Sequence, residues 1–430
     1  MAAGAEREEL KSTVPAGVLR QELPGGACLL VEPDSTLRSV SIGVWVRVGA
    51  RDEPSEQAGA SHFLEHLLFK GTARRSAREI SEAIDGVGGD INAYTAKEST
   101  TFYVRVPADH VEMAIDVLFD VVGSPRLHPD DVEAERHVIR EELLQRDDTP
   151  DDLVHDLITA SLFPGHPLGR DILGDRATIE ALAAADVEEF FHRHYGSSTF
   201  VVAVAGSIDA DQVTSDISQR LDGRRGEIVS RTPPATGVAP VRVDRRFTEQ
   251  VHLVLGWRGL HHAHRDRYAL AIANHVLGGG LASRLFEEVR ERRGLAYSVY
   301  SYVTGWSDAG LLGIYAGTAP ERAAETVKLI RGEVERLVAD GITEHELAVA
   351  TGYAEGALAL SLEQTASRMS RLAHSELAHG RVVTVEEQLV AYRAVTLADV
   401  QRVLDDVVTA SPVVAAVGAI GEEEVRAWLQ

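Results

Sequence analysis

The stretch Ala60–Thr72, ASHFLEHLLFKGT, sets two histidines and a glutamate in a largely apolar segment, in the order His62, Glu65, His66. On an α-helix, side chains four residues apart lie on one face, so His62 and His66 can direct two imidazoles at one point. Glu65 lies on the adjoining strip, and burying three ionisable groups among Phe and Leu side chains is costly without a shared partner. The alternative is a core helix with two satisfied histidines, but the stretch favours a helix that binds a metal ion, with zinc as the expected ion.

A catalytic zinc ion needs a third protein ligand and one position left open for water. The segment Pro129–Arg146, PDDVEAERHVIREELLQR, offers carboxylates for this purpose. Glu135 and Glu142 share one helix face to within about 20°, whereas Glu141 points away by roughly a quarter turn. Such a face suits one direct ligand and one carboxylate that orients an imidazole. Taken alone, the segment is more typical of a solvated acidic surface, but beside the histidine helix a metal site is favoured.

The chain of 430 residues is too long for one ordinary core, which predicts at least two domains. Its net charge of -23 argues against nucleic-acid and anionic-membrane partners, because both need a basic surface. No apolar run approaches the roughly 20 residues of a membrane span, and the polar, acidic N-terminus is unlike a targeting segment. Cys28 is the single cysteine, which excludes an internal disulfide and predicts an inert core thiol, so the expected location is cytoplasmic.

Hydrophobic periodicity and turn residues predict alternating strands and helices in the first half of the chain. Ser76 and Glu79 form a capping box at the start of a helix that Gly86 ends. The expected strands are 18–23, 27–31, 39–48, two within 90–106, and 199–205; the expected helices contain the histidine stretch and residues 76–86, 108–122, 129–146 and 151–162.

Residues 221–240 lose apolar periodicity and are rich in Pro, Gly and Arg, which predicts a linker at 222–240. After it the order begins again, with a strand at 251–257, a helix at 268–277 and a long helical region at 319–377. AADVEEFFHRHYGSSTFVVAVAG, near the end of the first half, is similar to LADVQRVLDDVVTASPVVAAVGA near the end of the second. The repeat predicts an α+β fold of two duplicated domains, 1–221 and 241–430, each a mostly antiparallel sheet packed with helices.

The two halves differ at the expected metal site. Where the first half has HFLEH, the second has AIANH, Ala271–His275, which lacks the first histidine and the glutamate. One Zn²⁺ per chain is therefore expected, in the first domain.

Five stretches give the chain a resemblance to the inverted-motif (HxxEH) zinc peptidases of the pitrilysin–insulysin group, in the branch of the mitochondrial processing peptidase and its bacterial homologues. They are HFLEHLLFKGT, NAYTAKEST, ERHVIREELLQRDDTPDD, GHPLGRDILG and LGGGLASRLFEEVRERRGLAYSVYS, and the likeness covers nearly the whole chain. The resemblance implies that His62, His66 and Glu142 hold the zinc ion, with Glu135 as a supporting residue.

The resemblance also implies residues that contact the substrate. Asn92 and Ala93 are expected on an edge strand that pairs with an extended peptide, and Phe69 is a further candidate for substrate contact. Arg290 and Tyr297, from the second domain, match a pair that meets the substrate or its tetrahedral intermediate.

These observations predict a zinc endopeptidase that acts on unfolded peptides or presequence-like segments, with Glu65 as the general base that accepts a proton from water. Relatives of this length generally work as two-subunit shells, so a homodimer is expected. Two alternatives stay open: a structural or assembly subunit without catalysis, and a processing factor for one dedicated precursor. The complete set of His62, Glu65, His66 and Glu142 favours the enzyme, but the sequence does not identify the substrate.

Two further motifs suggest binding sites that their surroundings do not support. Gly278–Gly280 follows a predicted helix and lacks Gly-Lys-Ser/Thr, so a phosphate loop is disfavoured and a helix end is expected. His261, His262 and His264 lie in a charged loop without a base, which is more typical of a solvated loop than of a metal site.

Overall fold

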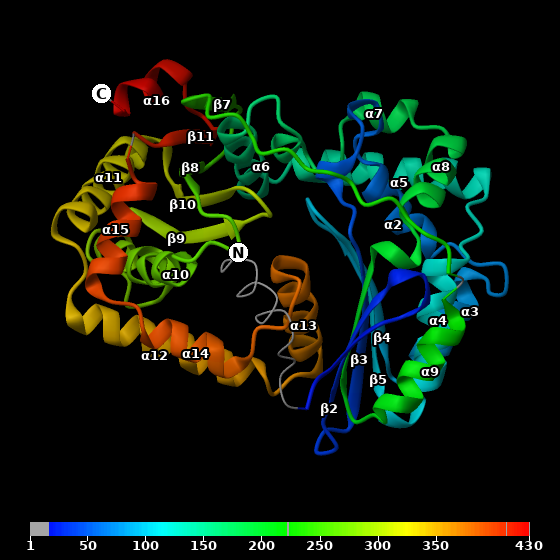
Figure 1. Cartoon of the computed structure of the whole chain (residues 1–430). Helices are drawn as coiled ribbons and strands as arrows, with labels where there is room; N and C mark the ends of the chain where they lie inside the picture. The colour runs from blue at the N-terminus through cyan, green and yellow to red at the C-terminus, as the bar shows by residue number, and fades with distance from the viewer. Residues whose placement is uncertain (1–16, 222, 410, 430) are drawn as a thin grey trace, which may run out of the picture. The chain divides into compact units, whose positions relative to one another are not determined.

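The computed structural model describes residues 17–221, 223–409 and 411–429, which fold into two compact units (Figure 1). The first unit runs to Leu143 and includes Asp171–Arg231 and Ala359–Thr384. The second contains Leu144–Arg170, Thr232–Leu358 and the chain from Val385 onward. Each unit has its own sheet and its own hydrophobic core, which confirms the predicted α+β class.

A six-stranded sheet organises the first unit, with the strand order β1-β2-β6-β3-β5-β4. The pair β2–β6 is parallel, and the other pairs are antiparallel. The strands are β1 (Leu19–Glu22), β2 (Cys28–Pro33), β3 (Ser39–Val46), β4 (Asp90–Thr95), β5 (Thr100–Pro107) and β6 (Phe200–Gly206). Strands β1 and β4 therefore form the two edges of this sheet.

Helices cover both faces of the first sheet. Successive side chains along each strand point to opposite faces, and both faces are apolar, so each face packs against its own group of helices. On β2, Leu29 and Val31 pack with one group of helices, whereas Cys28 and Leu30 pack against α13. Figure 1 shows α13 and α4 on opposite faces of the sheet. The helices of this unit are α2 (Ala60–Leu68), α3 (Ala77–Asp85), α4 (Val111–Gly123), α5 (Pro129–Asp147), α7 (Arg176–Ala181), α8 (Ala184–His194), α9 (Ala210–Arg220) and α13 (Thr365–His379).

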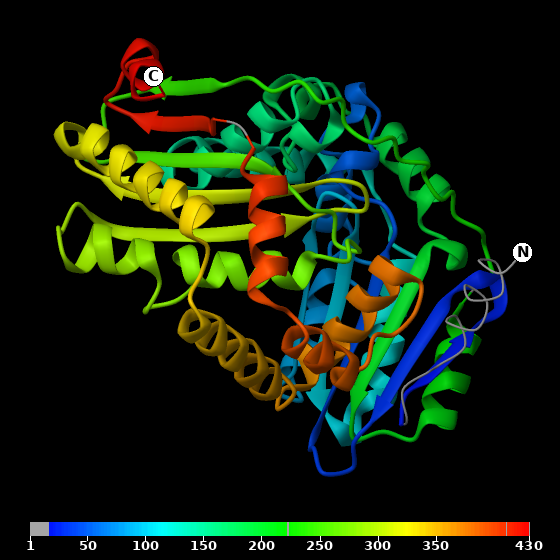
Figure 2. The same ribbon diagram turned by 60° about the vertical axis from the view of Figure 1, so that its left-hand side comes forward.

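A five-stranded sheet organises the second unit, with the order β7-β11-β8-β10-β9, and its strands form one layer in Figure 2. The pair β7–β11 is parallel and the others are antiparallel, so this sheet repeats the order and directions of the five strands from β2 to β4. The strands are β7 (Val241–Arg245), β8 (Val251–Gly259), β9 (Ala296–Gly305), β10 (Gly310–Thr318) and β11 (Val413–Gly418). The repeated topology agrees with the predicted duplication.

Helix α6 packs on one face of the second sheet through Val154, Ile158 and Leu162, and the remaining helices of the unit form the other core. The helices are α6 (Pro150–Leu162), α10 (Arg267–Asn274), α11 (Ala323–Asp340), α12 (Glu344–Ser361), α14 (Val385–Arg393), α15 (Leu397–Val407) and α16 (Glu422–Trp428). Among the described helices, none combines the length and apolarity that crossing a bilayer requires.

Two helices do not follow the division of the sequence into halves 1–221 and 241–430. Helix α6 belongs to the first half of the chain but packs on the second sheet, and α13 belongs to the second half but packs on the first sheet. Apolar periodicity shows that a helix has a face to bury, but not which sheet receives it. Residues 223–240, expected in the linker, contain no helix or strand.

Helix α2 begins directly after Gly59, whose φ of 96° lies in the left-handed region. A Cβ at Gly59 would come within 2.7 Å of the Leu173 carbonyl oxygen, so glycine is required there. The backbone N–H groups of Gly59 and Ser61 donate to the carboxylate of the buried Glu53 at 2.8 and 2.7 Å. A buried carboxylate at this end also complements the helix dipole, so these contacts fix where the histidine helix begins.

We expect Gly59→Ala to lower the free energy of unfolding by about 1–3 kcal/mol, because the left-handed backbone and the close carbonyl both oppose a side chain. Gly88→Ala is the matched control: Gly88 has a φ of 69°, but a Cβ there meets nothing within 4 Å. Thermal and denaturant unfolding measure both effects. Equal losses in the two variants would show that the contact with Leu173 does not constrain the start of α2.

Candidate metal centre

Helix α2 separates its apolar side chains from its ionisable ones. Phe63, Leu64 and Leu67 are buried in the core of the first unit, and this burial fixes the rotation of the helix. Side chains that are neighbours across a helix turn lie three or four residues apart, so His62 and His66 share a second face. Their ring centroids lie 4.6 Å apart, and both rings are half-buried.

Helix α5 brings Glu142 to the two histidines. One Glu142 carboxylate oxygen lies 3.6 Å from His62 Nε2, and the other lies 3.6 Å from His66 Nε2. One ligand atom from each of these three residues lies within 4.8 Å of the others, and no other group of three His, Cys, Asp or Glu residues in the described ranges meets this criterion. The set predicted from the sequence is therefore assembled within one unit.

The spacing of these atoms fits a zinc ion better than it fits hydrogen bonding. Zinc ligands at 2.0–2.2 Å in a tetrahedron lie about 3.4 Å from one another, close to the 3.6 Å observed, whereas 3.6 Å is too long for a hydrogen bond. The Glu142 Oε2 atom is buried and has no hydrogen-bond partner. Buried carboxylate oxygens are rarely left unsatisfied, so the donor set suits a shared cation.

Glu135 orients the second imidazole. His66 Nδ1 donates to Glu135 Oε2 at 3.0 Å, which leaves Nε2 as the nitrogen that faces Glu142. Lys70 contacts the other Glu135 oxygen. Burial opposes the charge of Glu135, but the hydrogen bonds from His66 and Lys70 outweigh it and lower the pKa of Glu135. Glu135 therefore remains an acceptor and holds His66 in one tautomer, a contact that the shared helix face of Glu135 and Glu142 had indicated.

The two histidines differ electrostatically. Burial, followed by the proximity of His66, lowers the pKa of His62 to about 4, so its imidazole is neutral at neutral pH. Burial also opposes the charge on His66, but the hydrogen bond with Glu135 and the nearby Glu142 and Glu65 carboxylates raise its pKa. A metal ligand must be the neutral imidazole, so a cation at this site would compete with a proton on His66.

Glu65 lies on the same helix as the two histidines, and its carboxylate is held by a strand of the sheet. Its Oε2 accepts a hydrogen bond of 2.5 Å from the Thr95 hydroxyl at the end of β4. Burial raises the pKa of Glu65, although the Thr95 hydrogen bond opposes the shift. Thr95 is a site residue that the sequence analysis missed, because a contact between a helix and a strand leaves no local pattern. The arrangement holds a carboxylate base in a fixed position beside three candidate ligands.

Comparison with known proteins shows which family the chain belongs to. Residues 29–176 match the family described as insulinase (peptidase family M16), and residues 181–351 match the peptidase M16 inactive domain. An uncharacterised zinc protease of Streptomyces coelicolor is 40% identical over 419 residues, which are 95% of this chain and 91% of that protein. This chain belongs to peptidase family M16.

Other members agree with this assignment and with the fold. The uncharacterised zinc protease YmxG of Bacillus subtilis is 38% identical to this M16 chain, over 88% of this chain and 93% of that protein. The crystal structure of a peptidase M16 inactive domain from Pseudomonas fluorescens has a TM-score of 0.88 at 21% identity, covering 94% of this chain and 98% of that one. The structural likeness confirms the two-sheet M16 fold.

The described residues of the second half of this M16 chain form no matching metal site. Its counterpart to HFLEH, Ala271–His275, lies at the end of α10 and the start of the π-helix His275–Gly279. His275 stacks on the ring of Tyr353, with 4.1 Å between centroids. The candidate centre in the first unit is thus the one site of this kind that the described residues form.

Two of the three predicted substrate residues of the first unit lie on the edge of its sheet, and the third follows helix α2. Asn92 and Ala93 are on β4, which is an edge strand because β5 is its one partner among the described strands. The Asn92 side-chain oxygen accepts the Ala93 N–H at 2.8 Å. Phe69 follows α2 directly, and its ring lies 6.1 Å from that of Phe102. An edge strand that ends at Thr95, the partner of Glu65, offers a backbone on which an extended peptide can pair.

Arg290 and Tyr297 lie close together in the second unit. The Arg290 guanidinium carbon is 4.7 Å from the Tyr297 ring centroid and also 4.7 Å from that of Phe286. Tyr297 is on β9, an edge of the second sheet, and 79% of it is exposed. This stack holds the arginine beside an accessible phenol, and the role of the pair in catalysis stays a prediction.

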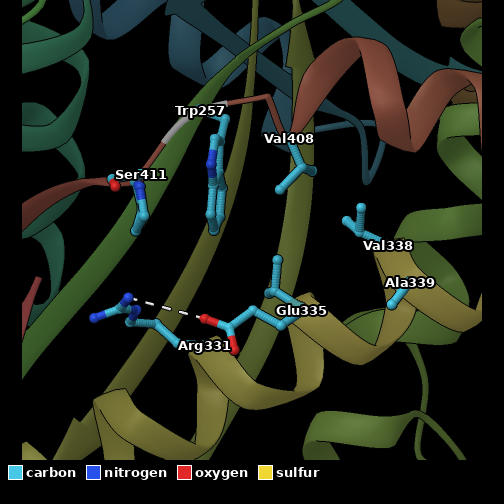
Figure 3. A pocket seen from close by; sticks show the side chains of 9 residues that line it. Trp257, Arg331, Glu335, Val338, Ala339, Val408 and Ser411 are labelled. Atoms are coloured by element: carbon cyan, nitrogen blue, oxygen red, sulfur yellow. Dashed lines mark ion pairs between the residues drawn. The ribbon is translucent and has the colours of Figure 1, made fainter.

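The second unit also contains a mainly apolar pocket of about 320 Å³, beside α11 (Figure 3). Trp257, Val338 and Val408 line it, and Arg331 and Glu335 form an ion pair of 3.8 Å at its side. Glu335 is the one carboxylate among the lining residues and is paired with Arg331, so the pocket offers neither a set of metal ligands nor an unpaired general base. The pocket therefore has no place in the candidate chemistry.

We expect Glu135→Gln to weaken zinc binding by roughly 10- to 100-fold, because it removes the charge that orients His66 and keeps Nε2 free. Competition with a chelating dye measures the affinity. Glu141→Gln, on the exposed side of the same helix, is the control and should bind zinc as the unaltered protein does. Unchanged affinity in Glu135→Gln would show that Glu135 does not support the site.

Proposed function

We propose that this chain is a zinc endopeptidase that cleaves extended, unfolded peptides. The observation that carries the proposal is the triangle of His62 Nε2, His66 Nε2 and the Glu142 carboxylate, with 3.6 Å between each histidine nitrogen and a carboxylate oxygen. Three protein ligands with a fourth position open are typical of catalytic zinc sites, whereas structural sites are closed by four. When bound, zinc supplies a Lewis acid that polarises a carbonyl group and lowers the pKa of water towards about 7.

Glu65 has the position and the electrostatics of a general base in this proposal. Its carboxylate accepts a proton from the water that attacks the scissile carbonyl, and it then donates this proton to the leaving amine nitrogen. A base works best with a pKa near the operating pH, and burial shifts the pKa of Glu65 in that direction. The Thr95 hydroxyl holds one carboxylate oxygen, which leaves the other for the proton.

The edge strand β4 supports an extended substrate. A peptide that pairs with β4 has its backbone fixed by main-chain hydrogen bonds, so its side chains need not be specific for binding to occur. An unfolded segment provides such a backbone, whereas a folded protein has most of its backbone groups already paired. Asn92 and Ala93 are the proposed pairing residues, and Phe69 is a proposed contact for a side chain.

Tyr297 is the proposed donor to the carbonyl oxygen as negative charge develops there. The phenol is accessible, and the adjacent Arg290 adds positive charge that favours an oxyanion. The family resemblance of VRERRGLAYS supports this role. The chemistry needs such a donor besides the base, because a tetrahedral intermediate carries its charge on oxygen.

Glu65→Gln should abolish peptide cleavage while the protein retains one zinc ion per chain, because glutamine cannot accept the proton and Glu65 is not a ligand in the triangle. Hydrolysis of a quenched-peptide library and metal analysis of the same sample measure the two properties. Glu141→Gln is again the matched control and should retain both.

The outcomes of this experiment separate the candidate functions. Full cleavage by Glu65→Gln would remove Glu65 from the mechanism. A wild-type protein that binds zinc but cleaves no peptide would favour a structural or assembly subunit of the same fold. Cleavage confined to one precursor sequence would favour a dedicated processing factor.

Tyr297→Phe should lower kcat by about 10²- to 10³-fold, the range for loss of one oxyanion donor, with zinc content and thermal stability unchanged. Steady-state kinetics on one good library peptide measure the effect. Tyr353→Phe, at another exposed tyrosine of the same unit, is the control and should leave kcat unaltered. An unaltered kcat in Tyr297→Phe, or loss of zinc from it, would contradict the proposed role.

A further inference from the structure

The turn that joins β4 to β5 begins directly after Thr95, the residue that donates to Glu65. Within the turn, the Ala96 N–H donates to the Ser99 carbonyl oxygen at 2.8 Å. Thr95 and Thr100 form the strand pair nearest the turn. Because Thr95 is the strand residue next to the turn, the position of its hydroxyl depends on where the turn is held.

A loop that follows β3, residues 49–52, binds this turn through its backbone. The Ala50 N–H donates to the Ala96 carbonyl oxygen at 3.1 Å. The Arg51 N–H donates to the Lys97 carbonyl oxygen at 2.8 Å. A Cβ at Gly49 would come within 2.3 Å of the Ala96 carbonyl oxygen, so the loop and the turn are in close contact. Together they form the support for the end of β4.

Asp52 is the last residue of this loop, and its side chain is fully buried, with 0% exposed. Its Oδ2 accepts the Gly49 N–H at 3.0 Å. A buried carboxylate is costly unless a cation pairs with it, and the cation here is Arg231. Arg231 Nε donates to Asp52 Oδ1 and Nη2 donates to Oδ2, both at 2.8 Å. The planar guanidinium matches the two carboxylate oxygens, so the pair fixes direction as well as distance.

The same guanidinium also binds the turn. Arg231 Nη2 donates to the Glu98 carbonyl oxygen at 2.7 Å, and Nη1 lies 3.8 Å from Glu98 Oε2. The Glu98 side chain is also paired with Arg51, at 2.5 Å. Arg231 thus holds the loop through Asp52 and the turn through Glu98. An ammonium group, with all its donors on one nitrogen atom, does not match this two-sided geometry.

Arg231 comes from a part of the chain that is remote in sequence from the site. It is 179 residues from Asp52 and 133 residues from Glu98. It lies in the connection 223–240, which contains no helix or strand, and the second unit resumes at the next residue, Thr232. Ordering an arginine in such a segment costs side-chain entropy, which its contacts with Asp52 and Glu98 offset.

We propose that Arg231 is a positioning residue, which holds the β4–β5 turn and, through Thr95, the Glu65 carboxylate in the geometry that peptide cleavage needs. The inference rests on the proposed peptidase function and assigns part of it to the connection between the two units. Without the guanidinium, Asp52 is buried without its cation and the turn loses its contact at Glu98. A displacement of about 1 Å at a reacting group lowers a rate by as much as about 100-fold.

The test uses the full chain and one good peptide from the quenched library. Arg231→Ala should lower kcat by roughly 10- to 100-fold, with one zinc ion per chain retained. Arg20→Ala is the matched control, because Arg20 donates to the buried Glu376 through two nitrogens in the same way, at 2.9 and 2.8 Å. It should lower the melting temperature, as Arg231→Ala does, but change kcat by less than about twofold.

A double-mutant cycle with Thr95→Val shows whether Arg231 acts through Thr95. Valine keeps the branched shape of threonine but cannot donate to Glu65. In the Thr95→Val background, Arg231→Ala should therefore lower kcat by less than about threefold. Its effect on the melting temperature should be the same in both backgrounds, because the pair with Asp52 does not involve the Thr95 hydroxyl.

The outcomes separate this inference from the proposed function. If thermal unfolding shows that Arg231→Ala does not fold, Arg231→Lys provides the second test and should lower kcat by about fivefold or more, because lysine keeps the charge but not the fork. If wild-type protein cleaves no peptide, the proposed function fails and the role of Arg231 fails with it. If it cleaves peptides and the Arg231 variant keeps its kcat, loses its zinc or lowers kcat equally in both backgrounds, the inference is overturned while the peptidase function stands.

Discussion

The candidate centre depends on one constraint: the imidazoles of His62 and His66 and the carboxylate of Glu142 converge without hydrogen-bonding to one another. At 3.6 Å, His62 and His66 are too far from Glu142 to share a proton with it, yet close enough to share a cation. Half-buried ionisable groups in this arrangement are costly in the absence of a partner. Among the described residues this is the one group of three possible metal ligands, and local departures from the rules of stable packing are typical of functional sites.

The first unit positions the residues of the centre through contacts from several of its elements. Glu53 accepts two N–H groups at the start of α2, and the apolar face of α2 is buried against the sheet. Glu135 and Thr95 then fix one atom each of His66 and Glu65. Because His66 and Glu65 each have a supporting partner on another element, the positions of these two side chains do not depend on their own rotamer preferences alone.

The sequence predicted the parts of the site that depend on local periodicity. The spacing of His62 and His66 on one helix, and of Glu135 and Glu142 on another, follows from the number of residues per turn. Both helices and the Ser76 capping box are present in the structure. The α+β class and the repeated topology were likewise predictable, because strands and helices recur in the same order in both halves.

Contacts between distant segments could not be predicted in this way. Thr95, Lys70 and Glu53 support the centre from a strand end, a helix end and a loop, and nothing in their neighbouring residues marks this role. The packing of α6 and α13 on sheets formed by the other half of the chain was also missed. An amphipathic helix specifies an apolar face but not the surface that covers it, so only the folded chain reveals the pairing.

The position of bound zinc is the measurement that tests the central claim most directly. Anomalous scattering at the zinc absorption edge, from crystals of protein purified with zinc, locates the ion without any assay of activity. The account predicts one strong peak per chain, about 2.0–2.2 Å from His62 Nε2, His66 Nε2 and a Glu142 oxygen. A peak bound by His261 and His264 instead, or no peak between α2 and α5 in zinc-loaded crystals, would contradict it.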